Sequence, residues 1–363
     1  MINVLFVGPT QGNGGIFSWT KKFVKAFPNE EFNIIRASIS YRRCKSTSNS
    51  LFSRIFDGLL DLRYAYRNAK SVIKNNDISL YHIVTSGSFG TLRDLVIIKL
   101  CHRHGIKGVM HCRYGCIPED IQSKGWLGKL LRKTMNQYDQ IWVLDSRSYN
   151  ALCDIPSLKD KVHLTPNSIE VKEPMDKKPK QYNRVAFIAN LIPTKGLFEL
   201  TEAVVRLNNV TLDIIGPGED AVVEQLKRIA GDKLEKQVFI HGSLPNEQAV
   251  EFMKKVDIMA LPTYYPWEGF PISIIEAMSL TKMVISCPRA AIPDMLTDID
   301  GNRCGILVPE KSVDDIEKAI VWCREHKEEA DKMCQKAYEK VYEKYRTEVV
   351  YELYRTNYRM LLK

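Results

Sequence analysis

The sequence predicts an α/β protein with two parallel sheets, each flanked by helices. Short apolar runs that suit buried strands alternate with amphipathic, helix-like segments over most of the chain. Nearly every apolar run ends in a loop with Gly, Pro or small polar residues. The length of 363 residues suits two domains of ordinary size. Together these observations favour one covered parallel sheet in each half of the chain.

We expect six strands in each half. In the first half they span residues 3–8, 32–37, 80–85, 107–111, 140–144 and 162–165. In the second half they span residues 184–189, 212–215, 238–240, 258–261, 283–286 and 305–308. Sheets of this kind bind ligands beyond the carboxyl ends of their strands, so functional residues are expected in the loops that follow the strands.

A polar segment separates the two halves. Residues 172–183 contain Pro174, Pro179 and four lysines, which is typical of a linker between domains. We predict an N-terminal domain at 1–171, a linker at 172–183, a C-terminal domain at 184–345 and a C-terminal helix at 346–363. Tyrosines near the C-terminus recur at helical spacings and predict a packing stripe: Tyr338, Tyr342, Tyr345, Tyr351, Tyr354 and Tyr358.

The composition is that of a soluble globular protein, with 45% hydrophobic and 26% charged residues. The nine cysteines are an odd number without paired spacing, and no signal peptide is recognised, so a reducing cytoplasm is expected. No apolar run approaches the ~18 residues that a membrane span needs. The His and Cys residues between 101 and 116 match no standard zinc spacing, and we expect neither a metal nor a cofactor.

The net charge of +9 is unevenly distributed. Residues 1–165 hold 24 Lys and Arg against 12 Asp and Glu, whereas the remainder holds 28 against 31. The first half is therefore expected to meet nucleic acid, anionic lipid or a phosphorylated substrate. Segments 41–74 and 124–133 interleave basic residues with apolar and aromatic ones. Each suits either an anionic membrane surface or a helix with a core-facing side and a solvated basic side.

Segment 261–280 carries two carboxylates in an unusual setting. An aromatic loop holds Glu268, and the apolar helix that follows holds Glu276. Pro271 suits the first turn of this helix. Because the helix reads as buried nearly all round, the Glu276 carboxylate is expected to need hydrogen-bond donors. A buried salt bridge or a position at the helix margin would provide them, and so would the hydroxyls of a ribose or a sugar.

Three further features lie where ligands bind in such sheets. Gly14 and Gly15 follow the first strand and open a helix, which suits an anion site or a plain tight turn. Lys195 lies at the carboxyl end of its strand, where it suits a phosphate, although a surface lysine is the alternative. His111 ends the fourth strand.

In their order along the chain, these features resemble the retaining glycosyltransferases of family four, which have the GT-B fold. The resemblance covers nearly the whole chain and is strongest from residue 186 to 309. It implies two Rossmann-like domains that face each other across a deep cleft, with a C-terminal helix packing back toward the first domain. The matching pieces are Gly14-Gly15, His111, Pro166-Asn167, Lys195-Gly196, Gly216-Pro217-Gly218, the Gly242 loop, and Glu268-Gly269-Phe270-Pro271 with Glu276, the E-x7-E pattern of the family.

The resemblance implies a role for each of these residues. Glu276 resembles the carboxylate that binds the ribose hydroxyls, Glu268 the one that contacts the donor sugar, and Lys195 the cation that neutralises the diphosphate. His111 resembles the residue beside the reacting sugar. The remaining nucleotide-sugar-binding positions are Ser243 and Leu244 for the base, and the backbone at Gly14, Gly15, Gly269, Phe270, Pro271 and Ile272 for the diphosphate.

One position departs from the family pattern. Many relatives carry an arginine where Asn190 stands, five residues before Lys195, and a second cation then joins the diphosphate. Here that charge is either missing or supplied from elsewhere by Arg184, Arg289 or Arg113. Charge stabilisation of the departing diphosphate is normally a large catalytic effect, so the replacement bears on the rate.

The resemblance implies a hexosyltransferase that uses a nucleotide-sugar, with UDP favoured as the nucleotide. We expect retention of configuration and a glycan or polyprenyl-diphosphate-linked acceptor in the assembly of O-antigen, lipopolysaccharide or capsule. The basic first half would bind this acceptor at the inner face of the cytoplasmic membrane, which makes the enzyme a peripheral cytoplasmic one. No nucleic-acid motif is recognised, and no nucleic-acid partner is expected.

Two alternatives remain open. A nucleotide-sugar epimerase shares the fold and would convert the donor with no acceptor present. A catalytically silent sugar-nucleotide-binding subunit would bind without turnover, and Asn190 gives that possibility its weight.

Overall fold

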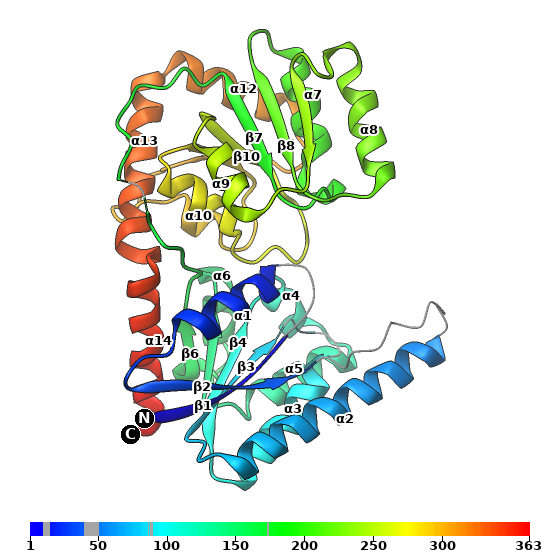
Figure 1. Cartoon of the computed structure of the whole chain (residues 1–363), viewed down its shortest axis with the longest axis vertical. Coiled ribbons are helices and arrows are strands. Elements are labelled where there is room, and N and C mark those ends of the chain that lie inside the picture. The colour runs from blue at the N-terminus through cyan, green and yellow to red at the C-terminus, as the bar shows by residue number, and fades with distance from the viewer. Residues whose placement is uncertain (10–14, 40–50, 86, 88–89, 173) are drawn as a thin grey trace. The chain divides into compact units, whose positions relative to one another are not determined.

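The computed structural model describes residues 1–9, 15–39, 51–85, 87, 90–172 and 174–363, with only the backbone for 51–57. Contacts divide the chain into two units (Figure 1). The first unit is Met1–Pro166 together with Tyr351–Lys363, and the second is Asn167–Val350. The C-terminal residues therefore belong with the first unit, as the resemblance implies.

The first unit contains a parallel sheet of six strands in the order β2-β1-β3-β4-β5-β6. Its strands are β1 (Ile2–Gly8), β2 (Phe32–Ser38), β3 (Leu80–Thr85), β4 (Lys107–Cys112), β5 (Gln140–Val143) and β6 (Val162–Leu164). Its helices are α1 (Gly15–Ala26), α2 (Leu51–Asn75), α3 (Gly90–Arg103), α4 (Ile117–Gln122), α5 (Trp126–Met135), α6 (Ser146–Cys153) and the short η1 (Lys159–Lys161).

The side chains of this sheet alternate between two different cores, because successive residues of a strand point to opposite faces. On one face the strands pack with α2, α3 and α5 in a hydrophobic cluster that includes Tyr81, Met110 and Ile141. The opposite face is rich in rings and meets α1 and the C-terminal helix α14 (Thr347–Leu362). That face carries Phe6, His82, His111 and Trp142.

The second unit contains a parallel sheet in the order β12-β11-β10-β7-β8-β9. Its strands are β7 (Arg184–Ile188), β8 (Thr211–Ile215), β9 (Val238–Gly242), β10 (Ile258–Leu261), β11 (Met283–Ser286) and β12 (Ile306–Leu307). All twelve predicted strands are therefore confirmed, with ends within two residues of those expected. The helical elements are η2 (Pro193–Lys195), α7 (Leu197–Arg206), α8 (Asp220–Ala230), η3 (Gly231–Lys233), α9 (Asn246–Met253), α10 (Ile272–Ser279), α11 (Ile292–Met295), α12 (Val313–Glu325), α13 (Lys327–Lys340) and the π-helical η4 (Val341–Tyr345).

The predicted tyrosine stripe is correct for five of its six members. Tyr338, Tyr345, Tyr351, Tyr354 and Tyr358 are buried, whereas Tyr342 is 46% exposed and lies against the Arg346 guanidinium. The helical period fails at Tyr342 because the π-helical turn η4 interrupts it, since a π-turn holds more residues than an α-helical turn.

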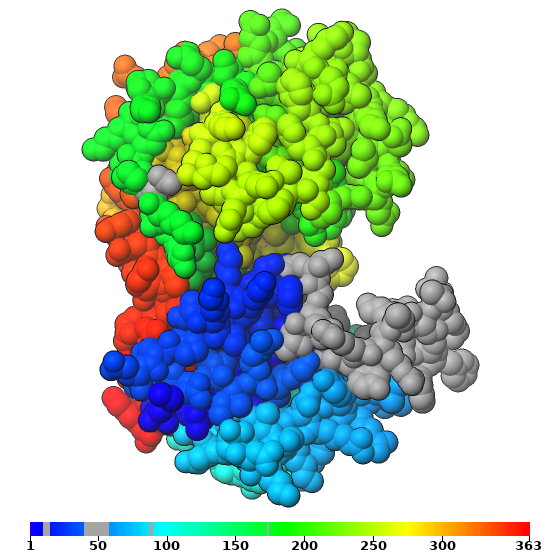
Figure 2. Space-filling model, viewed as in Figure 1, coloured from blue at the N-terminus to red at the C-terminus, as the bar shows by residue number. Residues whose placement is uncertain are grey.

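The basic helix α2 has a core-facing side from residue 58 on. Ala65, Ala69 and Ile73 are buried in the hydrophobic cluster, whereas Arg63 and Arg67 are exposed. This arrangement fits a helix with a core-facing side and a solvated basic side, one of the two interpretations offered for segment 41–74. Both α1 and α2 contribute to the surface of the first unit (Figure 2). Residues 41–50 of that segment, including Arg42 and Arg43, lie outside the described residues.

Within the ranges that the structure describes, no helix is long and apolar enough to cross a bilayer.

Candidate active site

Two loops at the carboxyl edge of the second sheet bring Lys195 and Glu268 together. Lys195 ends η2, which follows β7, and Glu268 lies in the loop after β10. Since β7 and β10 are neighbours in the sheet, both loops leave at the same edge. Lys195 Nζ donates to Glu268 Oε2 at 2.8 Å, and Thr263 Oγ1 donates to the same oxygen at 3.1 Å. The sequence predicts both charged residues for this site, but it does not predict their pairing or the role of Thr263.

The ion pair is largely removed from solvent. The side chain of Lys195 is 14% exposed and that of Glu268 is 9% exposed. A buried pair of this kind is costly to break by removing one partner, because the other charge stays desolvated. A ligand that reaches Lys195 must therefore compete with the Glu268 carboxylate or bind both groups.

Gly196 allows the two loops to approach each other. Its φ of +77° lies in the left-handed region, and a Cβ built there would lie 2.1 Å from the carbonyl oxygen of Pro262. The backbones also bond directly, because Tyr264 N donates to Thr194 O at 2.8 Å. The Lys195-Gly196 pair in the sequence thus has a geometric reason: the glycine lets the lysine reach the glutamate loop.

Glu276 lies on α10 at the margin of the buried helix face. Ile274, Ile275 and Ala277 are buried as predicted, but Glu276 is half-buried, so the expectation of a helix buried nearly all round is wrong at this position. Glu276 Oε1 accepts a hydrogen bond of 3.1 Å from Asn246 Nδ2.

The loop predicted to hold a base leads directly to Asn246. Ser243 and Leu244 follow β9, and Asn246 begins α9 after Pro245. Ser243 is exposed and Leu244 is half-buried. The structure therefore connects the base loop to the Glu276 carboxylate through the side chain of Asn246, which sequence reasoning missed.

The backbone around the glutamate loop is fixed from several sides. Phe270 is buried and its carbonyl accepts a 2.7 Å hydrogen bond from Asn167 Nδ2, the residue of the predicted Pro166-Asn167 motif. Gly269 O accepts from Ala291 N at 3.2 Å. Pro271 is the residue immediately before α10, rather than part of its first turn, and Ile272 is the first helical residue.

The three arginines considered as replacements for the missing cation lie in different places. Asn190 itself is exposed just after β7. Arg184 begins β7, at the opposite edge of the sheet, and lies 3.9 Å from Asp213. Arg289 Nε donates to Tyr265 O at 3.4 Å, in the loop that carries Glu268, and it also lies 3.6 Å from Glu310. Within the second unit, Arg289 is thus the one of these arginines that contacts the glutamate loop.

His111 lies in the first unit and is fully buried. Its Nδ1 lies 3.1 Å from His82 Nε2, and its Nε2 lies 3.3 Å from an amino group of Arg113. Burial, followed by the nearby Arg113 and His82, lowers the pKa of His111 well below its usual value. The Arg113 guanidinium stacks 3.7 Å from the centre of the Trp19 ring, and burial lowers its pKa to about 10.

The two glycines predicted for an anion site are only partly described. Gly14 lies outside the described residues, and Gly15 is the first residue of α1. For the described ranges, no cluster of three or more His, Cys, Asp or Glu side chains suits a metal ion.

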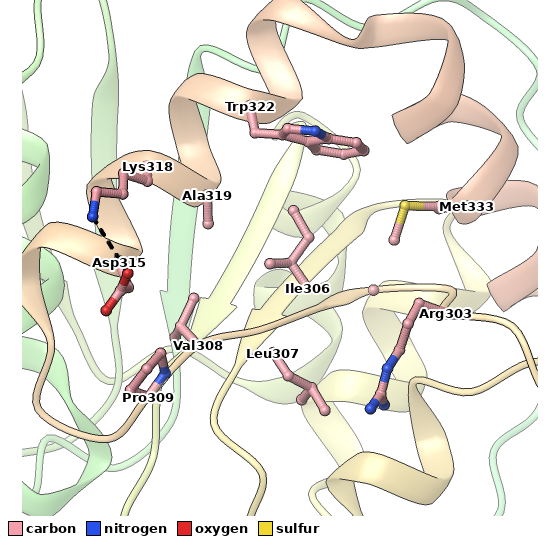
Figure 3. A pocket seen from close by; sticks show the side chains of 11 residues that line it. Arg303, Ile306, Leu307, Val308, Pro309, Asp315, Lys318, Ala319, Trp322 and Met333 are labelled. Atoms are coloured by element: carbon pink, nitrogen blue, oxygen red, sulfur yellow. Dashed lines mark ion pairs between the residues drawn. The ribbon is translucent and has the colours of Figure 1, made fainter.

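A pocket of about 570 Å³ lies elsewhere in the second unit (Figure 3). Its lining includes Ile306 of β12 and the adjacent Val308, Lys318 and Trp322 of α12, and Met333 of α13. None of the site residues predicted from the sequence lines it.

Comparison with known proteins connects the second unit to one family. Residues 169–340, just under half of the chain, match the sequence model described as Glycosyl transferases group 1. An uncharacterised glycosyltransferase of Methanocaldococcus jannaschii is 28% identical over 159 residues, which are 42% of this chain and 39% of that protein. The poly(ribitol-phosphate) alpha-N-acetylglucosaminyltransferase of Staphylococcus aureus is 29% identical over 173 residues, 46% of this chain and 34% of that protein. The chain therefore covers less than half the length of these relatives.

Solved structures match the whole chain. Sucrose-phosphate synthase from Thermosynechococcus elongatus has a TM-score of 0.77 at 13% identity, over 100% of this chain and 99% of that one. The Anabaena protein HepE in complex with UDP has a TM-score of 0.75 at 13% identity, over 99% and 100%. The lipopolysaccharide outer core galactosyltransferase WaaB has a TM-score of 0.68 at 15% identity, over 98% of both chains.

The family match supports the enzyme class that the sequence predicts, a glycosyltransferase, for the unit that it covers. The structural matches, at their low identities, bear on the fold alone. The chain thus has the GT-B fold, and its residues 169–340 carry the sequence pattern of the group 1 glycosyl transferases.

Proposed function

We propose that the chain is a retaining glycosyltransferase that moves a sugar from a nucleotide-sugar to a glycan or polyprenyl-diphosphate-linked acceptor. The observation that carries this proposal is the arrangement at the carboxyl edge of the second sheet. There Lys195 and Glu268 are paired at 2.8 Å, and Glu276 follows on the helix that begins after the same loop. One cation and two carboxylates, with a helix start between the carboxylates, suit a diphosphate with a sugar on each side.

The chemistry requires positioning and positive charge more than a strong acid. Glycosyl transfer breaks a bond to a diphosphate, which is already a good leaving group. We propose that Lys195 neutralises the leaving oxygens, aided by backbone N–H groups between Gly269 and Ile272, at the start of α10. Arg289, which follows β11 and donates to the glutamate loop, supplies the second cation that Asn190 does not. In this proposal the site uses no metal.

The two carboxylates bind different sugars. Glu276 accepts hydrogen bonds from the ribose hydroxyls, and Asn246 orients it from the base loop. Glu268 accepts from hydroxyls of the donor sugar and is not a nucleophile, because configuration is retained by attack on the same face as the departing diphosphate. A trapped glycosyl ester on Glu268 would contradict this part of the proposal.

UDP is the nucleotide that we favour for the donor. Anabaena HepE, which matches the fold of this chain, has been solved with UDP and with UDP-glucose. The acceptor is proposed to belong to a surface polysaccharide such as O-antigen or capsule. Relatives and neighbours with related names include the poly(ribitol-phosphate) and lipopolysaccharide enzymes described above.

The first unit offers a surface for an anionic membrane, where such an acceptor would lie. On α5, Trp126 is 61% exposed, and Lys129 and Lys133 are exposed on the same side of the helix. Leu131 and Met135 hold the other side of α5 in the core. We propose that this face binds acidic lipid and makes the enzyme peripheral at the inner face of the cytoplasmic membrane.

The test is calorimetric titration of the wild type and the Glu276→Ala variant with UDP, GDP and their common sugars, with donor hydrolysis followed in the same samples. We expect the wild type to bind nucleotides with one of the two bases selectively. Glu276→Ala should lose this binding, and Glu247→Ala, an exposed control on α9, should keep it. Absence of binding to every nucleotide would remove the basis of the proposal. Conversion of the donor sugar without an acceptor would indicate an epimerase, and binding without any turnover a silent subunit.

A further inference from the structure

We propose that His82 and Tyr358 are positioning residues that hold His111 in one neutral tautomer, with its proton on Nδ1. The three side chains form a hydrogen-bonded chain with Arg113 inside the first unit. The importance of His111 for catalysis rests on the proposed function, but the state of its ring follows from the geometry described next.

The first link fixes the acceptor. A guanidinium group can only donate hydrogen bonds, since it has no lone pair that accepts. Arg113 lies 3.3 Å from Nε2 of His111, so this nitrogen must carry the lone pair. A neutral imidazole with its lone pair on Nε2 carries its proton on Nδ1.

The second and third links continue in the same direction. Nδ1 of His111 donates to Nε2 of His82, at 3.1 Å. The proton of a neutral His82 then lies on its own Nδ1, which is 2.5 Å from the hydroxyl oxygen of Tyr358. Each ring nitrogen of His111 and His82 therefore has one assigned role as donor or acceptor. The hydrogen bonds are donated in one direction, from Arg113 toward Tyr358.

The surroundings favour neutral rings. Both histidines are 0% exposed, and their neighbours are the aromatic rings of Trp19, Phe6 and Trp142. A charged imidazole at this position would be desolvated and would lie next to the Arg113 guanidinium, so the neutral form is favoured. The groups facing the two rings that can titrate or carry charge, as the structure describes them, are Arg113, Tyr354 and Tyr358.

The strand register explains how the two histidines meet. His111 on β4 pairs with Val84 on β3, two residues beyond His82, so both rings point to the same face of the sheet. Tyr358 comes from α14, nearly 250 residues later in the chain. The C-terminal helix therefore supplies the last acceptor of a hydrogen-bonded series that begins at Arg113 and includes a side chain on β4.

The consequence concerns the part that His111 can take in the reaction. Both of its ring nitrogens are engaged, so it neither gives nor takes a proton during transfer. It instead presents a rigid ring and orients Arg113. A reaction with a diphosphate leaving group suits such a residue, because the leaving group needs no proton.

The experiment is long-range ¹H–¹⁵N NMR of the full chain labelled with ¹⁵N-histidine, followed from pH 5.5 to 8. For His111 and His82 we expect a protonated-type signal at Nδ1, a lone-pair-type signal at Nε2, and no titration over this range. Assignments come from the His111→Gln and His82→Gln variants. Titration of His111 near pH 6.5, or a proton on its Nε2, would overturn the proposal without any activity measurement.

A matched pair of tyrosine variants adds a second readout. Tyr358→Phe removes only the hydroxyl and keeps the ring that stacks on Trp142. Tyr138→Phe makes the same change at another buried tyrosine of this unit, which does not belong to the series of hydrogen bonds from Arg113 to Tyr358. We expect Tyr358→Phe to mix the tautomers of His82 and to lower kcat about tenfold at unchanged donor KM, as loss of a supporting partner does elsewhere. Tyr138→Phe should change neither.

The outcomes separate this inference from the proposed function. Unchanged tautomers in Tyr358→Phe would refute the positioning role, whether or not the protein transfers sugar. Fixed Nδ1–H tautomers in a protein that turns over no nucleotide-sugar would support the chain of hydrogen bonds and refute the proposed function.

Discussion

Lys195 donates a 2.8 Å hydrogen bond to Glu268, and Thr263 donates to the same carboxylate oxygen. Lys195, proposed for the diphosphate, and Glu268, proposed for the donor sugar, are therefore already paired in the absence of a ligand. A diphosphate that binds Lys195 would compete with the Glu268 carboxylate. Substitution of each residue in turn can distinguish their roles.

Removing the lysine should weaken nucleotide binding. We expect Lys195→Ala to raise the Kd for UDP at least tenfold, which corresponds to about 1.4 kcal/mol. Glu268→Gln should keep UDP binding within about threefold, because the amide frees Lys195, yet lower transfer about a hundredfold through lost contact with the donor sugar. Calorimetry and a transfer assay measure the two effects.

Lys236→Ala serves as the control for this experiment, since Lys236 is exposed and outside the site. An equal loss of UDP binding in Lys195→Ala and Glu268→Gln would mean that the pair supports the fold and does not divide its roles.

Asn246 is expected to support ribose recognition through Glu276. Asn246→Ala removes a donor from a partly exposed carboxylate and should weaken UDP binding about threefold to fivefold. Asn246→Asp places a second carboxylate beside Glu276 and should weaken binding further. If both variants bind UDP like the wild type, the contact between Asn246 and Glu276 has no part in binding.

The close approach at Gly196 predicts a loss of stability on substitution. Gly196→Ala combines a left-handed backbone with a Cβ 2.1 Å from Pro262 O, and we expect a loss of about 2 kcal/mol or more in the free energy of unfolding. Gly105→Ala is the control, because Gly105 also has a positive φ, +69°, but a Cβ there meets nothing within 4 Å. Denaturant unfolding of both variants separates backbone strain from the clash, and equal losses would remove the clash from the explanation.

The buried histidines predict a pH-dependent stability. Burial, followed by the nearby Arg113, lowers the pKa of His82 to about 3, whereas an unfolded histidine titrates near 6.5. Between these values the unfolded state binds more protons, so the free energy of unfolding rises with pH and levels off above about 6.5. From pH 7.5 to 5, His82 should account for a loss of about 2 kcal/mol.

Denaturant unfolding at pH 5 and 7.5 measures this effect in wild type and His82→Gln. The glutamine variant should lose less stability on acidification, although it is less stable at pH 7.5. An equal pH dependence in both proteins would show that His82 binds protons to the same extent in the folded and the unfolded chain, so that folding does not lower its pKa.

The sequence is informative where a residue's role follows from its own segment. The strands are predictable because buried apolar runs with turn residues at both ends have few other structures available. Lys195 and Glu268 could be placed at a sheet edge because each follows a predicted strand. Their pairing depends on the order of β7 and β10 in the sheet, which local patterns do not contain.

The residues that sequence reasoning missed all act through distant partners. His82 sits inside an apolar strand, and only the register of β3 against β4 places it beside His111. Asn246 begins a different helix from the one that carries Glu276. The half-buried state of Glu276 depends on which side of α10 the rest of the unit covers, so periodicity within α10 alone overestimates its burial. The sequence did contain a signal for His82. Two histidines on neighbouring predicted strands point to the same face of the sheet when one lies opposite the other or an even number of residues from that position.

The exposed face of α5 predicts binding to acidic vesicles. In the proposed contact Trp126 would insert its amphipathic ring, and Lys129 and Lys133 would contribute about 1 kcal/mol each at an anionic surface. We expect the triple variant Trp126→Ser, Lys129→Ser, Lys133→Ser to bind vesicles with 30% anionic lipid at least tenfold more weakly than the wild type, and to bind UDP equally well. The control changes Arg63, Arg67 and Lys70, which are exposed on one side of α2, to serine. Equal losses in the two variants would indicate that total charge, and not the α5 face, brings the protein to the membrane. Binding at high salt that the wild type and the α2 variant keep, and that the α5 variant loses, would assign the Trp126 ring to the anchoring contact.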